Sequence, residues 1–151
     1  MNPGRVITIV GLGLIIALFS VASGQMGDGP VVMTFSISGE QVLNAVDTMG
    51  TGSGIAALDG HLLVIGGTYS GLSSDVATDI AGGIHVHLGA RGENGGVVFP
   101  VGNTGGTEGT FSGAFMLDDD QVQQFLDGLF YINIHTLNNL PGEIRGQVES
   151  Q

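Results

Sequence analysis

The feature of the sequence that most constrains the fold is the alternation of apolar and polar residues in short segments, clearest in Ile84–Leu88. A β-strand sends successive side chains to opposite faces, so the apolar residues of this segment can enter a core while His85 and His87 share the other face. Imidazoles two residues apart on a strand lie roughly 7 Å apart at Cβ, close enough for both to bind one metal ion. The segment therefore predicts a strand that contributes to a core and to a polar site.

The same alternation recurs in Val31–Ser38 and Thr110–Leu117, and Asp59-Gly60 between two apolar segments is a favoured tight turn. The 28 glycines indicate many turns between short strands rather than long helices. About eight short strands are expected in roughly 120 residues. The sequence therefore predicts an all-β fold, an antiparallel Greek-key-like β-sandwich.

One short helix is expected over Asp118–Asp127. Asp118 can cap it, and the acidic residues that follow suit the positive end of the helix dipole. Val122, Phe125 and Leu126 are spaced to form its buried stripe.

Residues 6–22 are almost entirely apolar and follow Arg5, and Ala22-Ser23-Gly24 then supplies the small residues that signal peptidases prefer. The segment is at the short end of the roughly 17–25 residues that a spanning helix needs. Residues 1–24 are thus either a signal peptide cleaved before Gln25 or a retained hydrophobic anchor. Both alternatives place the rest of the chain outside the cytoplasm, and they allow membrane contact only through residues 6–22.

The chain is strongly acidic, with 14 Asp and Glu against 3 Lys and Arg and a formal net charge of −11. Such a charge repels nucleic acid, so no nucleic-acid partner is expected. The absence of cysteine excludes disulfides, thiolate metal sites and thiol catalysis. After a lead-in over residues 25–32, residues 33–149 are long enough for one domain and too short for two.

A second segment, Phe130–Thr136, repeats the pattern and places Tyr131, Asn133 and His135 on one face. If the two strands are neighbours, His135 and the two earlier histidines can converge on a metal ion. Imidazole ligands suit several transition metals, and the affinity order favours copper, with zinc less expected. Tyr131 and Asn133 would orient the imidazoles through hydrogen bonds. The alternative is that the histidines are polar residues on the solvent face of a sheet.

Three further polar residues are candidates for the site, and two of them, His61 and Arg145, each allow two interpretations. His61 follows the predicted turn and is either an exposed hairpin residue or a fourth ligand. Arg145 shares a strand face with Glu143 and is either its ion-pair partner or a cation that attracts anions to the imidazoles. Glu143 is also expected to help orient the ligands.

Three segments resemble the CHRD (chordin-type) domain family: residues 83–95, GIHVHLGARGENG, residues 128–136, GLFYINIHT, and residues 141–147, PGEIRGQ. Residues 35–41 and 69–72 also fit, so the resemblance spans about residues 33 to 148. It implies an extracytoplasmic β-sandwich of immunoglobulin-like or superoxide-dismutase-like character.

The histidine strand and the late Arg145-Gly146 pair are also similar to Cu/Zn superoxide dismutases. This second resemblance implies that His85 and His87 are copper ligands, that His135 is a third, and that Arg145 guides anions. The zinc-binding loop, the bridging histidine and the paired cysteines have no counterpart, so the site it implies holds copper alone. A copper-dependent oxidoreductase is the only enzyme class that the sequence indicates.

These observations lead to two hypotheses. The first is an exported CHRD-domain protein that binds copper through His85, His87 and His135, for copper handling or redox chemistry. The second is a non-catalytic structural or protein-interaction module of the cell envelope or extracellular matrix, which self-associates or binds an envelope protein.

Overall fold

The computed structural model describes residues 29–150. Residues 1–24, where a signal peptide or anchor is expected, and the first part of the 25–32 lead-in lie outside the described residues. Within residues 29–150, no helix is long and apolar enough to cross a membrane.

Nine antiparallel strands and one α-helix form the framework of residues 29–150, which confirms the all-β fold. The strands are β1 (Val31–Ser38), β2 (Thr51–Asp59), β3 (Leu62–Ser70), β4 (Ile84–Leu88), β5 (Val97–Pro100), β6 (Gly102–Asn103), β7 (Gly109–Met116), β8 (Phe130–Ile134) and β9 (Ile144–Val148). A 3₁₀ helix, η1 (Gly39–Gln41), follows β1, and α1 (Asp119–Leu126) connects β7 to β8.

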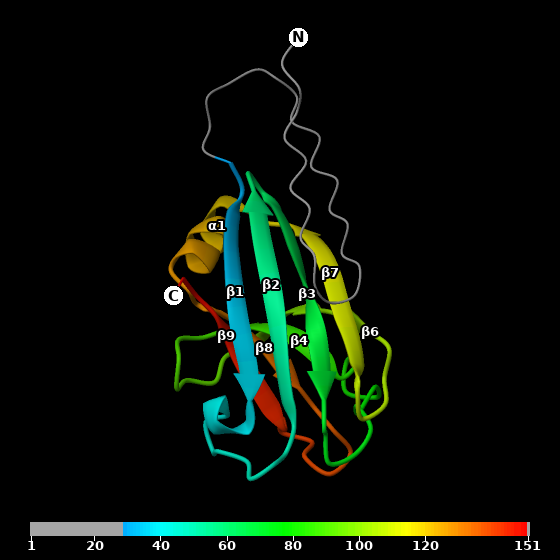
Figure 1. Ribbon diagram of the computed structural model, residues 1–151. Coiled ribbons are helices and arrows are strands. Elements are labelled where there is room, and N and C mark those ends of the chain that lie inside the picture. Colours follow the sequence, from blue (N-terminus) through cyan, green and yellow to red (C-terminus); the bar gives the residue numbers. More distant parts are fainter. Residues whose placement is uncertain (1–28, 151) are drawn as a thin grey trace.

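The strands form one sheet that folds over on itself. Their order is β5-β4-β8-β9-β1-β2-β3-β7-β6, and β5 and β6 are separated along the chain by Val101 alone. This segment therefore leaves β4 and joins β7, which links the two ends of the sheet. Figure 1 shows β1, β2, β3 and β7 as a front layer with β8 and β4 behind it. The expected sandwich is thus formed by a single continuous sheet.

The first hairpin turn lies one residue later than the predicted Asp59-Gly60 pair. Asp59 pairs with Leu62, so Gly60 and His61 form the turn. Gly60 has φ of 57°, a left-handed value that glycine adopts without strain and that two-residue hairpin turns require.

The predicted helix forms as expected at its N-terminus. Asp118 accepts a hydrogen bond from the backbone N–H of Gln121, and the Gln121 side chain accepts one from the Asp118 N–H, which makes a reciprocal capping box. Phe125 is fully buried and Val122 packs at the edge of the core, but Leu126 is 43% exposed. The buried stripe is therefore narrower than the sequence pattern predicted.

Every described strand except the two-residue β6 contributes apolar side chains to one core, and several glycines make room for its aromatic rings. Gly54 of β2 pairs with Phe35 of β1, and a Cβ on Gly54 would lie 2.3 Å from the Phe35 ring. Gly67 pairs with Phe111 of β7 in the same way, with a Cβ distance of 2.6 Å to the ring. The high glycine content thus reflects ring packing over the sheet as well as turns.

The outer face of β4, β8 and β9 is polar, yet it is buried. The strand register aligns its side chains in two rows: His85, Asn133 and Arg145 in one, and His87, Tyr131 and Gln147 in the other. None of these residues is more than 8% exposed. The loops over residues 71–83, 89–96 and 135–143 cover this face and form hydrogen bonds with it.

Glu143 is a fully buried carboxylate that ties these loops together. It accepts hydrogen bonds from Thr48, from the backbone N–H and hydroxyl of Ser73, and from Thr136 and Asn139. Burial alone would raise the pKa of Glu143, but these hydrogen bonds outweigh burial and hold the pKa below its usual value near 4.5.

Glu143→Gln should lower the free energy of unfolding by about 3 kcal/mol at neutral pH. The amide of Gln cannot accept all five hydrogen bonds, and its own N–H groups would face the donors that now bind the carboxylate. Since the folded-state pKa lies below the unfolded-state value, the carboxylate stabilises the fold fully above pH 4.5 and loses this effect as the pH falls through the folded-state pKa. Urea unfolding followed by circular dichroism at neutral and at successively lower pH measures both.

The exposed Glu108 provides the matched control, and Glu108→Gln should change the free energy of unfolding by less than about 0.5 kcal/mol. The difference between the wild type and Glu143→Gln should shrink on acidification. A difference that stays constant down to the acid transition would contradict the ionised, multiply bonded carboxylate.

Candidate metal centre

The imidazoles of His85, His87 and His135 converge on the outer face of β4 and β8. Their ring centroids are 5.0 to 6.2 Å apart, and one nitrogen from each ring lies within 4.8 Å of those from the other two. All three side chains are buried, with exposed fractions of 1%, 8% and 7%. The structure therefore brings the three predicted residues together, and they do not lie on a solvent-exposed face.

In each ring, one nitrogen faces a loop carbonyl. The contacts are His85 Nε2 to the oxygens of Ile80 and Ala81 (2.8 and 2.9 Å), His87 Nδ1 to that of Gly95 (3.0 Å) and His135 Nδ1 to that of Leu140 (2.7 Å). A carbonyl oxygen only accepts, so the facing nitrogen carries the proton and donates. The tautomer of each neutral ring is therefore determined by a loop.

The second nitrogen of each ring must then present a lone pair. His85 Nδ1 and His87 Nε2 are buried without any partner, and His135 Nε2 meets only the amide nitrogen of Asn133, at 3.3 Å. Within residues 29–150, the buried side-chain polar atoms that lack a partner are these two nitrogens and Asn133 Oδ1. All of them are acceptors, so this site is short of donors and suited to a cation.

Burial favours the neutral, metal-binding form of the imidazoles. It lowers the pKa of His87 and of His135 below the usual value near 6.5, and the hydrogen bonds to Gly95 and Leu140 only partly offset this effect. The charge of a protonated His85 would lower both pKa values further. Because a metal ion competes with protons for the same nitrogen, the lowered pKa favours metal binding.

The loop before β4 holds His85 with unusual backbone geometry. Ala81 has φ of 45°, the one non-glycine residue with a positive φ in the described chain, and Gly82 and Gly83 follow at 87° and 81°. A left-handed alanine is unfavourable and persists only where surrounding contacts demand it. Here it directs two consecutive carbonyls at the same imidazole nitrogen.

His85, His87 and His135, here called the triad, have dimensions close to those of a metal site. A tetrahedral ion with bonds of about 2.0–2.1 Å holds its ligands roughly 3.4 Å apart. The three nitrogens, up to 4.8 Å apart, reach this spacing through side-chain shifts of about 1 Å. His85, His87 and His135 can therefore hold a metal ion.

Arg145 supports the triad through a ring stack rather than through a charge pair. Its guanidinium carbon lies 3.6 Å from the centroid of the Tyr131 ring, and Tyr131 in turn stacks on His87 at 4.9 Å. Its terminal nitrogens donate to the carbonyls of Ala90 and Glu93 and to Gln147 Oε1. Of the two alternatives for Arg145, the ion pair with Glu143 is therefore wrong.

Neither Glu143 nor His61 contacts the imidazoles of His85, His87 and His135 through a hydrogen bond or an ion pair among the described residues. Glu143 binds loop donors and forms no hydrogen bond with a histidine in the described chain. His61, at the first hairpin turn, contacts the Leu117 carbonyl and lies 3.6 Å from an Asp119 oxygen. It does not belong to the histidine group, and it is exposed like an ordinary hairpin residue.

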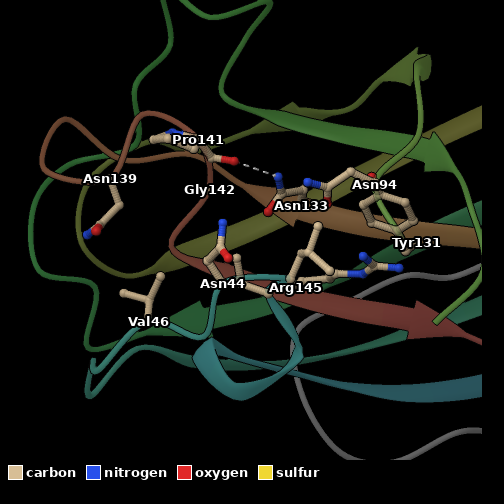
Figure 2. Close-up of a pocket in the computed structure, with 11 residues that line it drawn as sticks. Asn44, Val46, Asn94, Tyr131, Asn133, Asn139, Pro141, Gly142 and Arg145 are labelled. Atoms are coloured by element: carbon tan, nitrogen blue, oxygen red, sulfur yellow. Dashed lines mark hydrogen bonds between the residues drawn. The ribbon is translucent and has the colours of Figure 1, made fainter. Parts of the chain in front are cut away.

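A cleft of about 190 Å³ lies beside the triad. Figure 2 shows Asn133 and Tyr131 of β8 and Arg145 of β9 on one side, with Asn44 and Val46 across from them. None of the three histidines lines this cleft, whereas Asn133, which contacts His135, does. Asn133 therefore lies between His135 and the cleft, and Tyr131, which stacks on His87, lines the cleft as well.

Two parts of the site were not identified by the sequence analysis. The carbonyls that hold the rings belong to loop backbones, which give no residue-specific signal. Gln147 was not assigned a role, although it bonds to Arg145 and to the carbonyls of Gly89 and Gly128. Its position two residues after Arg145, on the same strand face, was the available signal.

A comparison with protein families gives a match over most of the chain. Residues 33–148 match the CHRD domain. Comparisons with curated proteins and with solved structures give no match, so the similarity to superoxide dismutases stays a prediction. Because the matched segment covers well over half of the 151 residues, this chain belongs to the CHRD domain family.

Proposed function

We propose that this CHRD domain binds a copper ion outside the cytoplasm through His85, His87 and His135. The observation that carries the proposal is the convergence of three buried imidazole nitrogens whose rings are each oriented by a loop carbonyl. Hydrogen bonds of this kind to the non-ligating nitrogen are typical of histidines that bind metals.

The ligand types favour copper. Affinity for nitrogen sites rises along the first-row divalent metals to Cu(II) and falls again at Zn(II). Carboxylates, which magnesium and calcium prefer, are absent from the histidine group. Zinc is the second choice, because three imidazoles also satisfy its preferences.

The apolar segment at residues 6–22 supports export, and its cleavage or retention decides between a secreted and a membrane-anchored protein. The role of the copper would be handling, by sequestration or delivery, or redox chemistry. If the domain is an enzyme, we expect a copper-dependent oxidoreductase, the class that the sequence indicates.

The second candidate is a non-catalytic structural or interaction module. It is favoured by Glu143, Arg145 and Gln147, which lie in the family motif yet serve to hold loops. On this hypothesis the imidazoles are loop anchors of the same kind. The effect of copper on stability separates the two candidates, because a ligand that binds only the native state raises the melting temperature.

The apoprotein should take up close to one copper ion per chain and show a Cu(II) electron paramagnetic resonance spectrum with nitrogen couplings. At free copper about 100 times Kd, binding stabilises the native state by about 2.7 kcal/mol, which corresponds to roughly 10 °C in Tm. Metal analysis and thermal melts with copper and with a chelator measure these effects.

His135→Ala should lower copper affinity at least about 100-fold, since it removes one of three ligands. His61→Ala is the matched control and should leave the affinity unchanged, because His61 lies outside the histidine group. Competition titration against a chelator of known affinity provides the comparison. An unchanged affinity in His135→Ala would rule out the three-histidine site.

Copper binding should resist mild acid. Because burial lowers the pKa of His87 and of His135 below the usual imidazole value near 6.5, protons compete for these two rings only at a lower pH than for exposed imidazoles, and the affinity of the protein should begin to fall below that value. A synthetic peptide of residues 83–89 has exposed histidines and should lose affinity from about pH 6.5 downward. If the copper affinities of the protein and of the peptide fell over the same pH range, the result would contradict a buried site.

A further inference from the structure

The two ends of the Asn133 side-chain amide differ in their hydrogen bonds: the nitrogen has two partners and the oxygen has none. Its nitrogen Nδ2 lies 3.3 Å from His135 Nε2 and 3.3 Å from the Pro141 carbonyl oxygen, both long for hydrogen bonds. Its oxygen Oδ1 is buried and has no partner. An orphaned buried carbonyl is costly and calls for a physical reason.

The orientation of this amide depends on the lone pair of His135. The ring donates through Nδ1 to Leu140, so Nε2 accepts, and the amide nitrogen is the end of Asn133 that fits against it. A cation bound at Nε2 would occupy that lone pair and repel the N–H groups. The same cation would attract the carbonyl end of the amide.

A half-turn of the amide would exchange the positions of its two ends. Oδ1 would then lie about 3.3 Å from His135 Nε2, close to the roughly 3.4 Å that separates two ligands of a tetrahedral ion. Asn133 also pairs directly with His85 in the strand register, so it is adjacent to two of the three ligands. The turn gives up two long contacts of Nδ2, those with His135 Nε2 and with the Pro141 carbonyl oxygen.

Gly142 leaves the amide room to turn. A Cβ at this position would lie 2.4 Å from Asn133 Oδ1 and 2.5 Å from Nδ2. The φ of 124° at Gly142 is one that other residues rarely adopt. The backbone therefore passes close to both ends of the amide without a side chain that would clamp it.

We propose that Asn133 is the fourth ligand of the metal site: when an ion binds, its amide turns and Oδ1 coordinates the ion. The inference rests on the proposed copper site. Because Asn133 lies between His135 and the cleft, and Tyr131 lies between His87 and the cleft, coordination by Oδ1 closes the site to small molecules from this side. A closed four-ligand site is typical of metal retention, whereas catalytic sites keep a position open. The role is therefore copper holding rather than turnover.

The test compares copper-loaded wild type, Asn133→Ala and Asn133→Asp. Asn133→Ala should bind copper roughly 10-fold more weakly or worse, on the scale seen for groups that support metal ligands, and azide should give a new absorption band and altered magnetic resonance parameters. The wild type should be insensitive to azide. Asn133→Asp has nearly the same size and offers a charged oxygen, so it should bind copper more tightly than the wild type.

Asn44→Ala is the matched control, since Asn44 lines the same cleft from an exposed segment. It should match the wild type in copper affinity, spectrum and azide response. Thermal melts of each apoprotein verify folding, and Asn133→Asp tests the proposal even where Asn133→Ala does not fold.

Three results would overturn the inference. Equal affinity and spectra in the wild type, Asn133→Ala and Asn133→Asp would show that the amide is no ligand, while the three-histidine site stands. An azide response in the wild type equal to that of Asn133→Ala would show an open position. Absence of copper uptake by the wild type would remove both the site and the fourth ligand.

Discussion

The need to satisfy buried loop carbonyls is the constraint on which the polar face of this domain depends. Loops fold over the outer face of β4, β8 and β9 and exclude water, so their carbonyl oxygens require donors from the strands. The donors are imidazole, guanidinium and amide N–H groups at alternate strand positions. Each neutral imidazole has a single N–H, and once a loop takes it, the other nitrogen has only a lone pair to offer. The geometry suited to a metal thus follows from loop anchoring.

Much of the fold could be predicted from local patterns. Alternation in Val31–Ser38 and Ile84–Leu88 identified strands and the faces of their side chains, and Asp118 identified the start of the helix. The assignment of both histidines of β4 to the face opposite the core depended on period two alone, and the structure agrees. Leu126 was placed in the core because a helical stripe does not say how wide the contacted surface is.

The parts that could not be predicted depend on distant pairings. Asn133 lies opposite His85 only because β4 and β8 pair in one register, 48 residues apart, and no local signal specifies that register. Arg145 and Glu143 share a strand face, yet each meets loops that approach from other parts of the chain. Their spacing allowed an ion pair as one of two alternatives, because the sequence pattern does not show which loops approach each side chain. The loop carbonyls that bind Arg145 have the same chemistry in every residue, and the donors that surround Glu143 include Thr48 and Ser73, which are distant in the sequence.

The scaffold and metal hypotheses share a physical basis. An ion bound by the three imidazoles would join β4, which carries His85 and His87, to the segment after β8, which carries His135. The carbonyls of Leu140 in that segment and of Gly95 in the loop after β4 already accept hydrogen bonds from the opposite nitrogens of His135 and His87. Hydrogen bonds in a connected network polarise one another. A positive charge on one side of an imidazole therefore strengthens the hydrogen bond that the ring N–H on its other side donates to a carbonyl. Occupation of the site would therefore tighten the loops that create it. Since Asn133 lies between His135 and the cleft, the same network that orders the loops would also determine what can reach such an ion.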